Sequence, residues 1–278
     1  MQNKKKSNFI FWGTPYVASE TLEILKENDF LPTLIVTNID KPQGRKMILT
    51  SSPVKIWAKK NSIPYLQPER LDAEFMQKLK ELIPNLNFSI VVAYGKIIPE
   101  KFLNLPKLDS LNVHYSLLPK YRGASPVESV ILNGETETGV SIQKMIYQMD
   151  AGDILAEEAT KIEPTEKAEE LKKRLINIGG SLLVKILPDF LEGKITPKKQ
   201  DESKATFCKK MKKEYGLIDL NDDPKKNYNK FRAYAYWPRT FFFKDGKRYI
   251  ITDAVLENDQ FIIKKVIPEG RKEVEYKN

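Results

Sequence analysis

The chain has 278 residues and a mass of 32.1 kDa, a length that predicts one large domain or two smaller ones. Hydrophobic residues make up 41% of it and charged residues 30%, which is the balance of a globular protein. One cysteine, Cys208, and one histidine, His114, exclude an internal disulfide and a zinc site built from these two residue types alone. Any chemistry that needs an imidazole must therefore use His114.

The net charge of +9 is concentrated at the two ends of the chain. Residues 1–60 and 201–278 carry about +5 each, whereas residues 61–200 carry about −1. A basic excess of this kind is typical of proteins that bind a polyanion such as nucleic acid or a membrane surface. A lysine-rich surface that only keeps the protein in solution would give the same count.

The amino-terminal sequence does not resemble a targeting segment. The apolar run that starts at Phe9 reaches Gly13 and Pro15 almost at once, which leaves no signal-peptide core and too little length for a transit peptide. No later stretch approaches the ~20 apolar residues of a membrane span. We therefore expect a cytoplasmic protein without a membrane partner.

The first part of the chain alternates between strand and helix patterns. Short apolar runs predict buried strands at 8–12, 34–36, 89–93 and 111–114. Apolar residues at helical spacing predict three helices: one that begins near Val17, a second that ends near Lys60, and a third over 75–82. This alternation favours an α/β fold with a Rossmann-like, doubly wound and mostly parallel sheet.

The second part of the chain changes character twice. Residues 166–190 form an amphipathic stretch that predicts a long helix, interrupted near Gly179 and Gly180. Residues 193–205 are polar and predict a linker. Short strands are expected at 248–252 and 260–264, so residues 206–278 are interpreted as a small, basic, β-rich domain.

One short region has residues suited to chemistry. Asn112 and His114 are two apart on a predicted strand, so both side chains point to the same side, at the carboxyl end where open α/β sheets bind ligands. A further strand at 138–142 turns into the small-residue segment that contains Asp150. If these three side chains converge, they suit acyl transfer to an amine. The amide and the imidazole can stabilise an oxyanion, and the carboxylate can support a charged imidazole and relay protons.

Less specific readings of the same residues stay open on this pattern alone. A single histidine in an apolar strand is more often structural than catalytic, and Asp150 and Asp153 can simply cap a turn.

The run from Asn112 to Pro119 resembles the signature of the 10-formyltetrahydrofolate-dependent formyltransferases. The resemblance extends over nearly the whole chain, and within the family it is strongest to members that act on methionyl-initiator tRNA. The matching segments, in chain order, are Gly13–Pro15, Asp40–Arg45, Ser52–Lys55, Val92–Pro99, Asn112–Pro119, Arg122–Gly123, Glu137–Val140, Met149–Asp153, Arg232–Ala233 and Trp237–Pro238.

The resemblance implies a role for each matched segment. Asn112, His114 and Asp150 align with the catalytic residues of the family. Contacts to 10-formyltetrahydrofolate, the formyl-donor cosubstrate, are implied for Tyr94, Gly95, Lys96, Ile97, Ile98, Ser116, Leu117, Leu118 and Pro119. Contacts to the tRNA are implied for Lys41, Arg45 and Lys46, whose basic charge suits phosphate. No metal is expected, and the protein is expected to act as a monomer.

The resemblance also implies a domain organisation. Residues 1–192 are expected to form the formyltransferase domain, 193–205 the linker, and 206–278 a tRNA-binding domain that resembles a reduced OB-like barrel. It is expected to be reduced because the stretch 255–261 is predicted to lack a strand pair. In addition, Met47, Ile48 and Leu49 make the basic loop less basic than in many relatives.

Three other functions are compatible with parts of this pattern. A sugar-nucleotide formyltransferase would share the catalytic core, but it would not need the basic loop or the basic carboxyl-terminal region. A glycinamide ribonucleotide formyltransferase would lack the second domain. A catalytically inert RNA-binding protein on the same fold would not need Asn112, His114 and Asp150 together.

Overall fold

The computed structural model describes residues 8–44 and 47–277, which form two compact units. The first unit contains the chain up to His114 together with Val140–Glu158 and Ile176–Glu202. The second unit contains Tyr115–Gly139, Ala159–Leu175 and the chain from Ser203 onward. Each unit is therefore assembled from segments that are separated in the sequence.

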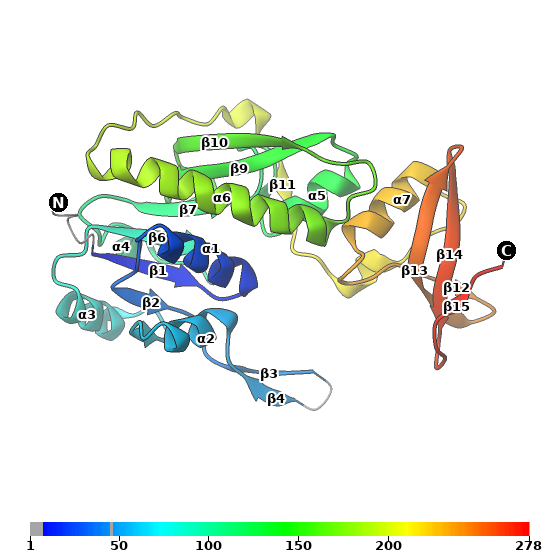
Figure 1. Cartoon of the computed structure of the whole chain (residues 1–278), viewed down its shortest axis with the longest axis horizontal. Helices are drawn as coiled ribbons and strands as arrows, with labels where there is room; N and C mark the ends of the chain where they lie inside the picture. The colour runs from blue at the N-terminus through cyan, green and yellow to red at the C-terminus, as the bar shows by residue number, and fades with distance from the viewer. Residues whose placement is uncertain (1–7, 45–46, 278) are drawn as a thin grey trace. The chain divides into compact units, whose positions relative to one another are not determined.

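A seven-stranded sheet, in the order β10-β9-β7-β6-β1-β2-β5, is the main element of the fold (Figure 1). Strands β7, β6, β1, β2 and β5 are parallel, and β9 runs antiparallel to β7. The predicted α/β fold with a mostly parallel sheet is thus confirmed. The strands are β1 Phe9–Gly13, β2 Leu34–Val36, β5 Tyr65–Leu66, β6 Phe88–Val92, β7 Ser110–His114, β9 Glu137–Lys144 and β10 Ile154–Lys161.

Helices cover both faces of this sheet, as a doubly wound fold requires. Ile10 and Trp12 of β1 pack into a core with residues of α3 and α4. On the opposite face, Phe9 stacks on Phe88 at 4.8 Å between ring centroids, and Phe88 meets Phe190 of α6 at 5.7 Å. The α-helices of the described chain, not all of which pack on this sheet, are α1 Tyr16–Glu27, α2 Pro53–Lys60, α3 Ala73–Leu82, α4 Glu100–Leu103, α5 Pro126–Leu132, α6 Ala168–Leu191 and α7 Pro224–Ala233.

Helix α6 is continuous, so the predicted interruption near Gly179 and Gly180 is wrong. A Cβ atom on Gly180 would lie 2.5 Å from Cδ1 of Ile24 and 3.1 Å from its Cβ, which is too close for an ordinary contact. The glycine is therefore needed for the close approach of α6 to α1, and the helical hydrogen bonds compensate its low helix propensity.

The carboxyl-terminal sheet contains four antiparallel strands in the order β12-β13-β14-β15. The expectation that residues 255–261 lack a strand pair is wrong, because β13 and β14 continue to a two-residue turn and Leu256 pairs with Phe261. Asn258 and Asp259 both have positive φ, as a tight hairpin turn of this twist requires. The strands are β12 Phe241–Lys244, β13 Lys247–Glu257, β14 Gln260–Pro268 and β15 Val274–Glu275.

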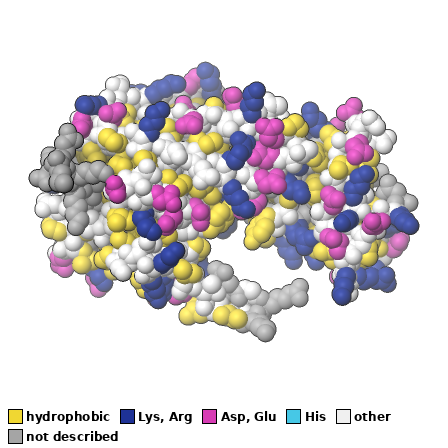
Figure 2. All heavy atoms as spheres, in the orientation of Figure 1, with side chains coloured by type: hydrophobic (Ala, Val, Ile, Leu, Met, Phe, Trp, Pro, Cys, Tyr) yellow, Lys and Arg dark blue, Asp and Glu magenta, His cyan; other side chains and the backbone are white. Residues whose placement is uncertain are grey.

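Helix α7 packs on this sheet through an apolar core. Tyr228 and Phe231 of α7 meet Phe242, Ile251 and other buried residues of the strands. On the face seen in Figure 2, lysine and arginine side chains of the sheet are interspersed with acidic ones. The region is therefore a helix-backed antiparallel sheet with a mixed but basic surface.

The predicted linker is hydrogen-bonded to the first unit, to which its residues up to Glu202 belong. The main chain of Lys198 exchanges two hydrogen bonds of 2.8 Å with Ile154 at the start of β10, and residues Glu202–Lys204 form a single 3₁₀ turn. After this turn, β11 (Phe207–Cys208) pairs with β8 (Arg122–Gly123) within the second unit.

Candidate active site

Strand β7 carries Asn112 and His114, the first two predicted catalytic residues. They are two residues apart on a regular strand, so their side chains lie on the same face of the sheet. Asn112 is 9% exposed and His114 is 5% exposed. The central position of β7, between β6 and β9, thus holds an amide and an imidazole side by side in a largely buried setting.

Asp150 lies in the turn between β9 and β10 and meets both of these side chains. Its Oδ2 is 3.7 Å from Nδ1 of His114, and its Oδ1 accepts a hydrogen bond of 3.5 Å from Nδ2 of Asn112. The turn must therefore fold onto the face of the sheet that carries Asn112 and His114. The structure brings the three predicted catalytic residues together.

Two glutamines that the sequence did not single out complete this cluster. Gln143 of β9 lies opposite Asn112 in the strand register and donates a hydrogen bond of 3.0 Å to Oδ1 of Asp150. Gln200, from the predicted linker, donates to the main-chain carbonyls of Asp150 and Gly152 at 2.8 and 2.7 Å. A signal for Gln143 existed: it is a polar residue at the end of a run that was expected to be a buried strand.

Gly152 fixes how closely the turn approaches strand β9. A Cβ atom at this position would lie 1.7 Å from the carbonyl oxygen of Lys144. The backbone N–H of Lys144 also donates a hydrogen bond of 2.9 Å to the carbonyl of Asp153, which joins the turn to β9. The small residues of this turn therefore permit contact between two backbone segments, one of which carries Asp150.

The two segments predicted to bind folate are only partly exposed. Tyr94 and Ile98 belong to the apolar core, and burial raises the pKa of the Tyr94 phenol to about 12. The carbonyl of Tyr94 accepts hydrogen bonds from Thr14 and Asn38, at 3.2 and 2.7 Å. Ile97, in contrast, is 77% exposed. Gly95 is exposed too, and Lys96 donates to the carbonyls of residues 68 and 69.

The second predicted folate segment follows His114 directly in the chain. Ser116 is fully buried and donates a hydrogen bond of 2.6 Å to the carbonyl of Lys120. Leu118 is buried, whereas Leu117 and Pro119 are partly exposed. The residues of the two segments that are at least partly exposed are therefore Gly95, Lys96, Ile97, Leu117 and Pro119.

The predicted tRNA-binding loop is an antiparallel hairpin of β3 (Lys41–Gln43) and β4 (Ile48–Thr50), which extends beyond α2 in Figure 1. Lys41 is exposed at its base, whereas Arg45 and Lys46 lie outside the described residues. Asp40 anchors the base through Nζ of Lys55 at 2.6 Å. This contact and hydrogen bonds from Gln67 and Ser51 lower the pKa of Asp40 to about 2.

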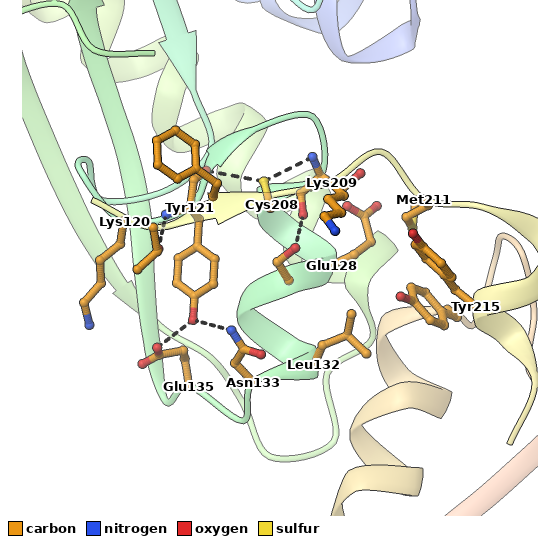
Figure 3. Close-up of a pocket in the computed structure, with 15 residues that line it drawn as sticks. Lys120, Tyr121, Glu128, Leu132, Asn133, Glu135, Cys208, Lys209, Met211 and Tyr215 are labelled. Carbon is orange, nitrogen blue, oxygen red and sulfur yellow. Dashed lines mark hydrogen bonds between the residues drawn. The ribbon is translucent and has the colours of Figure 1, made fainter. Parts of the chain in front are cut away.

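The second unit contains a cavity of about 610 Å³ that the sequence did not indicate (Figure 3). Tyr121 lines it, donating a hydrogen bond of 2.7 Å to Glu135 and accepting one of 3.0 Å from Asn133. Burial, together with the bond to Glu135, raises the pKa of Tyr121 to about 12. None of the lining residues is among the predicted site residues.

Two structural observations concern metals and membranes. In the described part of the chain, no three His, Cys, Asp or Glu side chains lie together as a metal site would need. Of the helices formed by residues 8–44 and 47–277, none is both long and apolar enough to cross a membrane.

Comparison with known proteins identifies the family. The family profile described as "Formyl transferase" matches residues 5–187, and "Formyl transferase, C-terminal domain" matches residues 210–275. The chain belongs to the formyl transferase family.

A curated relative agrees with this family, and two solved structures share the fold. A methionyl-tRNA formyltransferase of Sulfurihydrogenibium sp. is 39% identical over 251 residues, which cover 89% of this chain and 80% of the relative. The structure of an N-formyltransferase from Helicobacter canadensis with folinic acid and dTDP-3-aminofucose has a TM-score of 0.70 at 18% identity, covering 98% of this chain and 100% of that one. A methionyl-tRNA formyltransferase structure from Clostridium thermocellum has a TM-score of 0.62 at 19% identity, covering 97% and 100%. At these identities the two structures support the fold alone.

Proposed function

We propose that this protein transfers the formyl group of 10-formyltetrahydrofolate to the α-amine of methionyl-initiator tRNA. The observation that carries the proposal is the cluster of Asn112, His114 and Asp150, with the carboxylate 3.7 Å from the imidazole and 3.5 Å from the amide. The acceptor is supported by the 39% identity to a methionyl-tRNA formyltransferase over most of both chains.

The first step is attack of the neutral amine on the formyl carbon. A C–N bond forms, and the electron pair of the carbonyl moves onto oxygen to give a tetrahedral oxyanion. Asn112 and protonated His114 donate hydrogen bonds to this oxygen, and one such donor typically contributes 10²–10³ in rate. Because both donors are mounted on one strand, they need no reorganisation as the charge develops.

The second step returns the carbonyl and releases tetrahydrofolate. The attacking nitrogen loses a proton to Asp150, directly or through a water molecule, and Asp150 passes this proton on to N10 of the folate as the bond between N10 and the formyl carbon breaks. Asp150 also orients His114, since its Oδ2 lies 3.7 Å from Nδ1 of the imidazole. No covalent acyl-enzyme is needed.

Substrate binding is assigned to the segments for which the sequence predicts it. The exposed Gly95 and Ile97 and the partly exposed Leu117 and Pro119 suit contact with a flat folate ring. Lys41, and Arg45 and Lys46 further along the sequence, would meet the phosphate backbone of the tRNA, which supplies much of the affinity for a nucleic acid.

We propose a different role for each of three segments of the chain. Residues 1–192 would perform formyl transfer, 193–205 would connect, and 206–278 would add tRNA affinity through a basic antiparallel sheet. We propose that the reaction takes place in the cytoplasm and that the protein acts as a monomer.

The acceptor is tested by offering two amines to the purified full-length protein with 10-formyltetrahydrofolate. We expect formylation of methionyl-initiator tRNA and little transfer to dTDP-3-aminofucose. Efficient transfer to the amino sugar with none to the tRNA would assign the protein to the sugar-nucleotide formyltransferases. The absence of formyl transfer to any amine would favour the inert RNA-binding alternative.

The assigned residues are tested in the same assay. His114→Ala and Asp150→Asn should each lower kcat by about 10²–10³. Near wild-type activity in either variant would remove the mechanism. Arg45→Ala should raise KM for tRNA without changing KM for the folate. Lys107→Ala is the matched control, because this exposed lysine precedes the first residue of β7 and His114 is the last.

A further inference from the structure

Gln143, which is not one of the predicted catalytic residues, makes a shorter hydrogen bond to the Asp150 carboxylate than Asn112 does. Gln143 donates to Oδ1 of Asp150 at 3.0 Å, compared with 3.5 Å from Asn112 and 3.7 Å to Nδ1 of His114. Gln143 is 1% exposed. A buried primary amide is costly without hydrogen bonds, so a glutamine is retained here only with a polar partner such as this carboxylate.

The strand register explains why Gln143 can reach Asp150. β9 runs antiparallel to β7, and Gln143 is the direct cross-strand partner of Asn112. Directly opposed residues of an antiparallel pair share a face of the sheet. Gln143 and Asn112 therefore approach the same carboxylate oxygen from two neighbouring strands, and the position of the carboxylate is defined relative to both.

Gln200 holds the main chain of the same turn. Its Nε2 lies 2.8 Å from the carbonyl oxygen of Asp150 and 2.7 Å from that of Gly152, and it also donates to Oε1 of Gln143 at 3.4 Å. The main-chain bridge between Lys198 and Ile154 fixes this segment two residues earlier. Gln200 is thus preset to face the turn.

Such support is needed because the turn is not in a relaxed conformation. Asp150 has a φ of 50°, in the left-handed region, which aspartate tolerates better than most residues with a Cβ but adopts mainly in turns. A conformation of this kind persists where the surrounding structure over-determines it. The hydrogen bonds from the side-chain amide of Gln200 to the carbonyls of Asp150 and Gly152 supply that constraint.

We infer that Gln143 and Gln200 are positioning residues for Asp150. Gln143 orients the carboxylate toward His114, and Gln200 holds the backbone from which that carboxylate projects. The inference rests on the proposed formyl transfer, because it assigns both glutamines to the same reaction through Asp150. Neither glutamine needs to touch the substrates.

The test is steady-state kinetics of the full-length Gln143→Met and Gln200→Met variants, in which a side chain of similar length replaces each amide. We expect kcat to fall about ten- to a hundredfold, since misplacement of a reacting group by about 1 Å can cost 10² in rate. KM for tRNA and for the folate should stay within about twofold, because substrate contacts are intact. Gln77→Met, at an exposed position on α3, is the matched control and should keep the wild-type kcat.

A double-mutant cycle separates positioning from a general loss of structure. In an Asp150→Asn background, Gln143→Met should lower kcat by less than threefold, because its effect passes through the carboxylate. An unchanged kcat in the single Gln143→Met and Gln200→Met variants would overturn the inference. So would an undiminished effect in the Asp150→Asn background.

If the wild-type protein does not formylate tRNA, the proposed function is refuted. Crystal structures of the two variants then still test the inference. In Gln143→Met the Asp150 carboxylate should turn away from His114. An unchanged carboxylate position in that variant and an unchanged turn in Gln200→Met would overturn the inference independently of turnover.

Discussion

Gly152→Ala is the substitution whose effect follows most directly from the geometry of the turn. The new Cβ would lie 1.7 Å from the carbonyl oxygen of Lys144 and 2.9 Å from its carbonyl carbon. Both are backbone atoms of a paired strand, so no side-chain rotation can relieve the overlap. To reach even a tight separation of 3.0 Å, the turn must move away from β9 by about 1.3 Å.

The displacement would carry Asp150 away from its partners. The hydrogen bond of 3.0 Å from Gln143, lengthened by this amount, would be outside hydrogen-bond range, and so would those from Gln200. A shift of this size in a reacting group costs about 10² in rate, or about 2.7 kcal/mol of transition-state stabilisation. We also expect a loss of about 1–3 kcal/mol in the free energy of unfolding from overpacking.

The assay is kcat for formyl transfer, measured with the free energy of unfolding in urea. Gly193→Ala is the control, because this glycine has a φ of 66° and open space around its Cβ position. It should cost about 1–2 kcal/mol in stability from backbone strain and leave kcat unchanged. If Gly152→Ala keeps wild-type kcat, then the placement of Asp150 does not limit the reaction and the assigned role of this carboxylate is wrong.

Two further predictions concern stability. Gly180→Val should lower the free energy of unfolding by about 1–3 kcal/mol, because its side chain would overlap Ile24, and Ile24→Ala in the same chain should recover part of the loss in urea unfolding. Asp40, whose pKa is lowered to about 2 chiefly by its hydrogen bond with Lys55, should contribute stability that is complete above about pH 4 and is lost as pH falls toward 2. The difference in Tm between the wild type and Asp40→Asn should therefore shrink over this pH range, and a constant difference would refute the assignment.

Local pattern was enough to predict part of the candidate site. Strand alternation alone placed Asn112 and His114 on one face, because a period of two leaves no other arrangement on a regular strand. The convergence of Asp150 with them came from the resemblance to the family, since nothing in the local pattern fixes where a turn of nine residues folds. The positions of Asn112 and His114 therefore follow from local strand geometry, whereas that of Asp150 depends on how the chain folds.

The features that could not be predicted depend on pairing between distant segments. Gln143 meets Asp150 only because β9 joins β7 in one particular antiparallel register, and the sequence does not specify which strands become neighbours. Gln200 requires the additional bridge between residues 154 and 198. The cavity beside Tyr121 likewise combines residues from 120–135 with residues from 206–234.

The misjudged glycines and hairpin have a similar cause. Gly179 and Gly180 look like a helix break when only propensity is considered, but Gly180 is where α6 packs against Ile24 of α1. Asn258 and Asp259 look like a loop, but their positive φ values form the turn that lets β13 and β14 extend to their full length.

The choice of neutral amides around Asp150 has a chemical consequence. Asn112, Gln143 and Gln200 supply hydrogen-bond donors to this residue without adding a positive charge. A lysine or arginine in the place of Gln143 would orient the carboxylate equally well, but it would compensate the negative charge on which His114 and the reacting amine depend. An amide orients and leaves that charge uncompensated. In the proposed reaction, the charge of Asp150 then acts toward His114, 3.7 Å away, and toward the nitrogen that loses a proton.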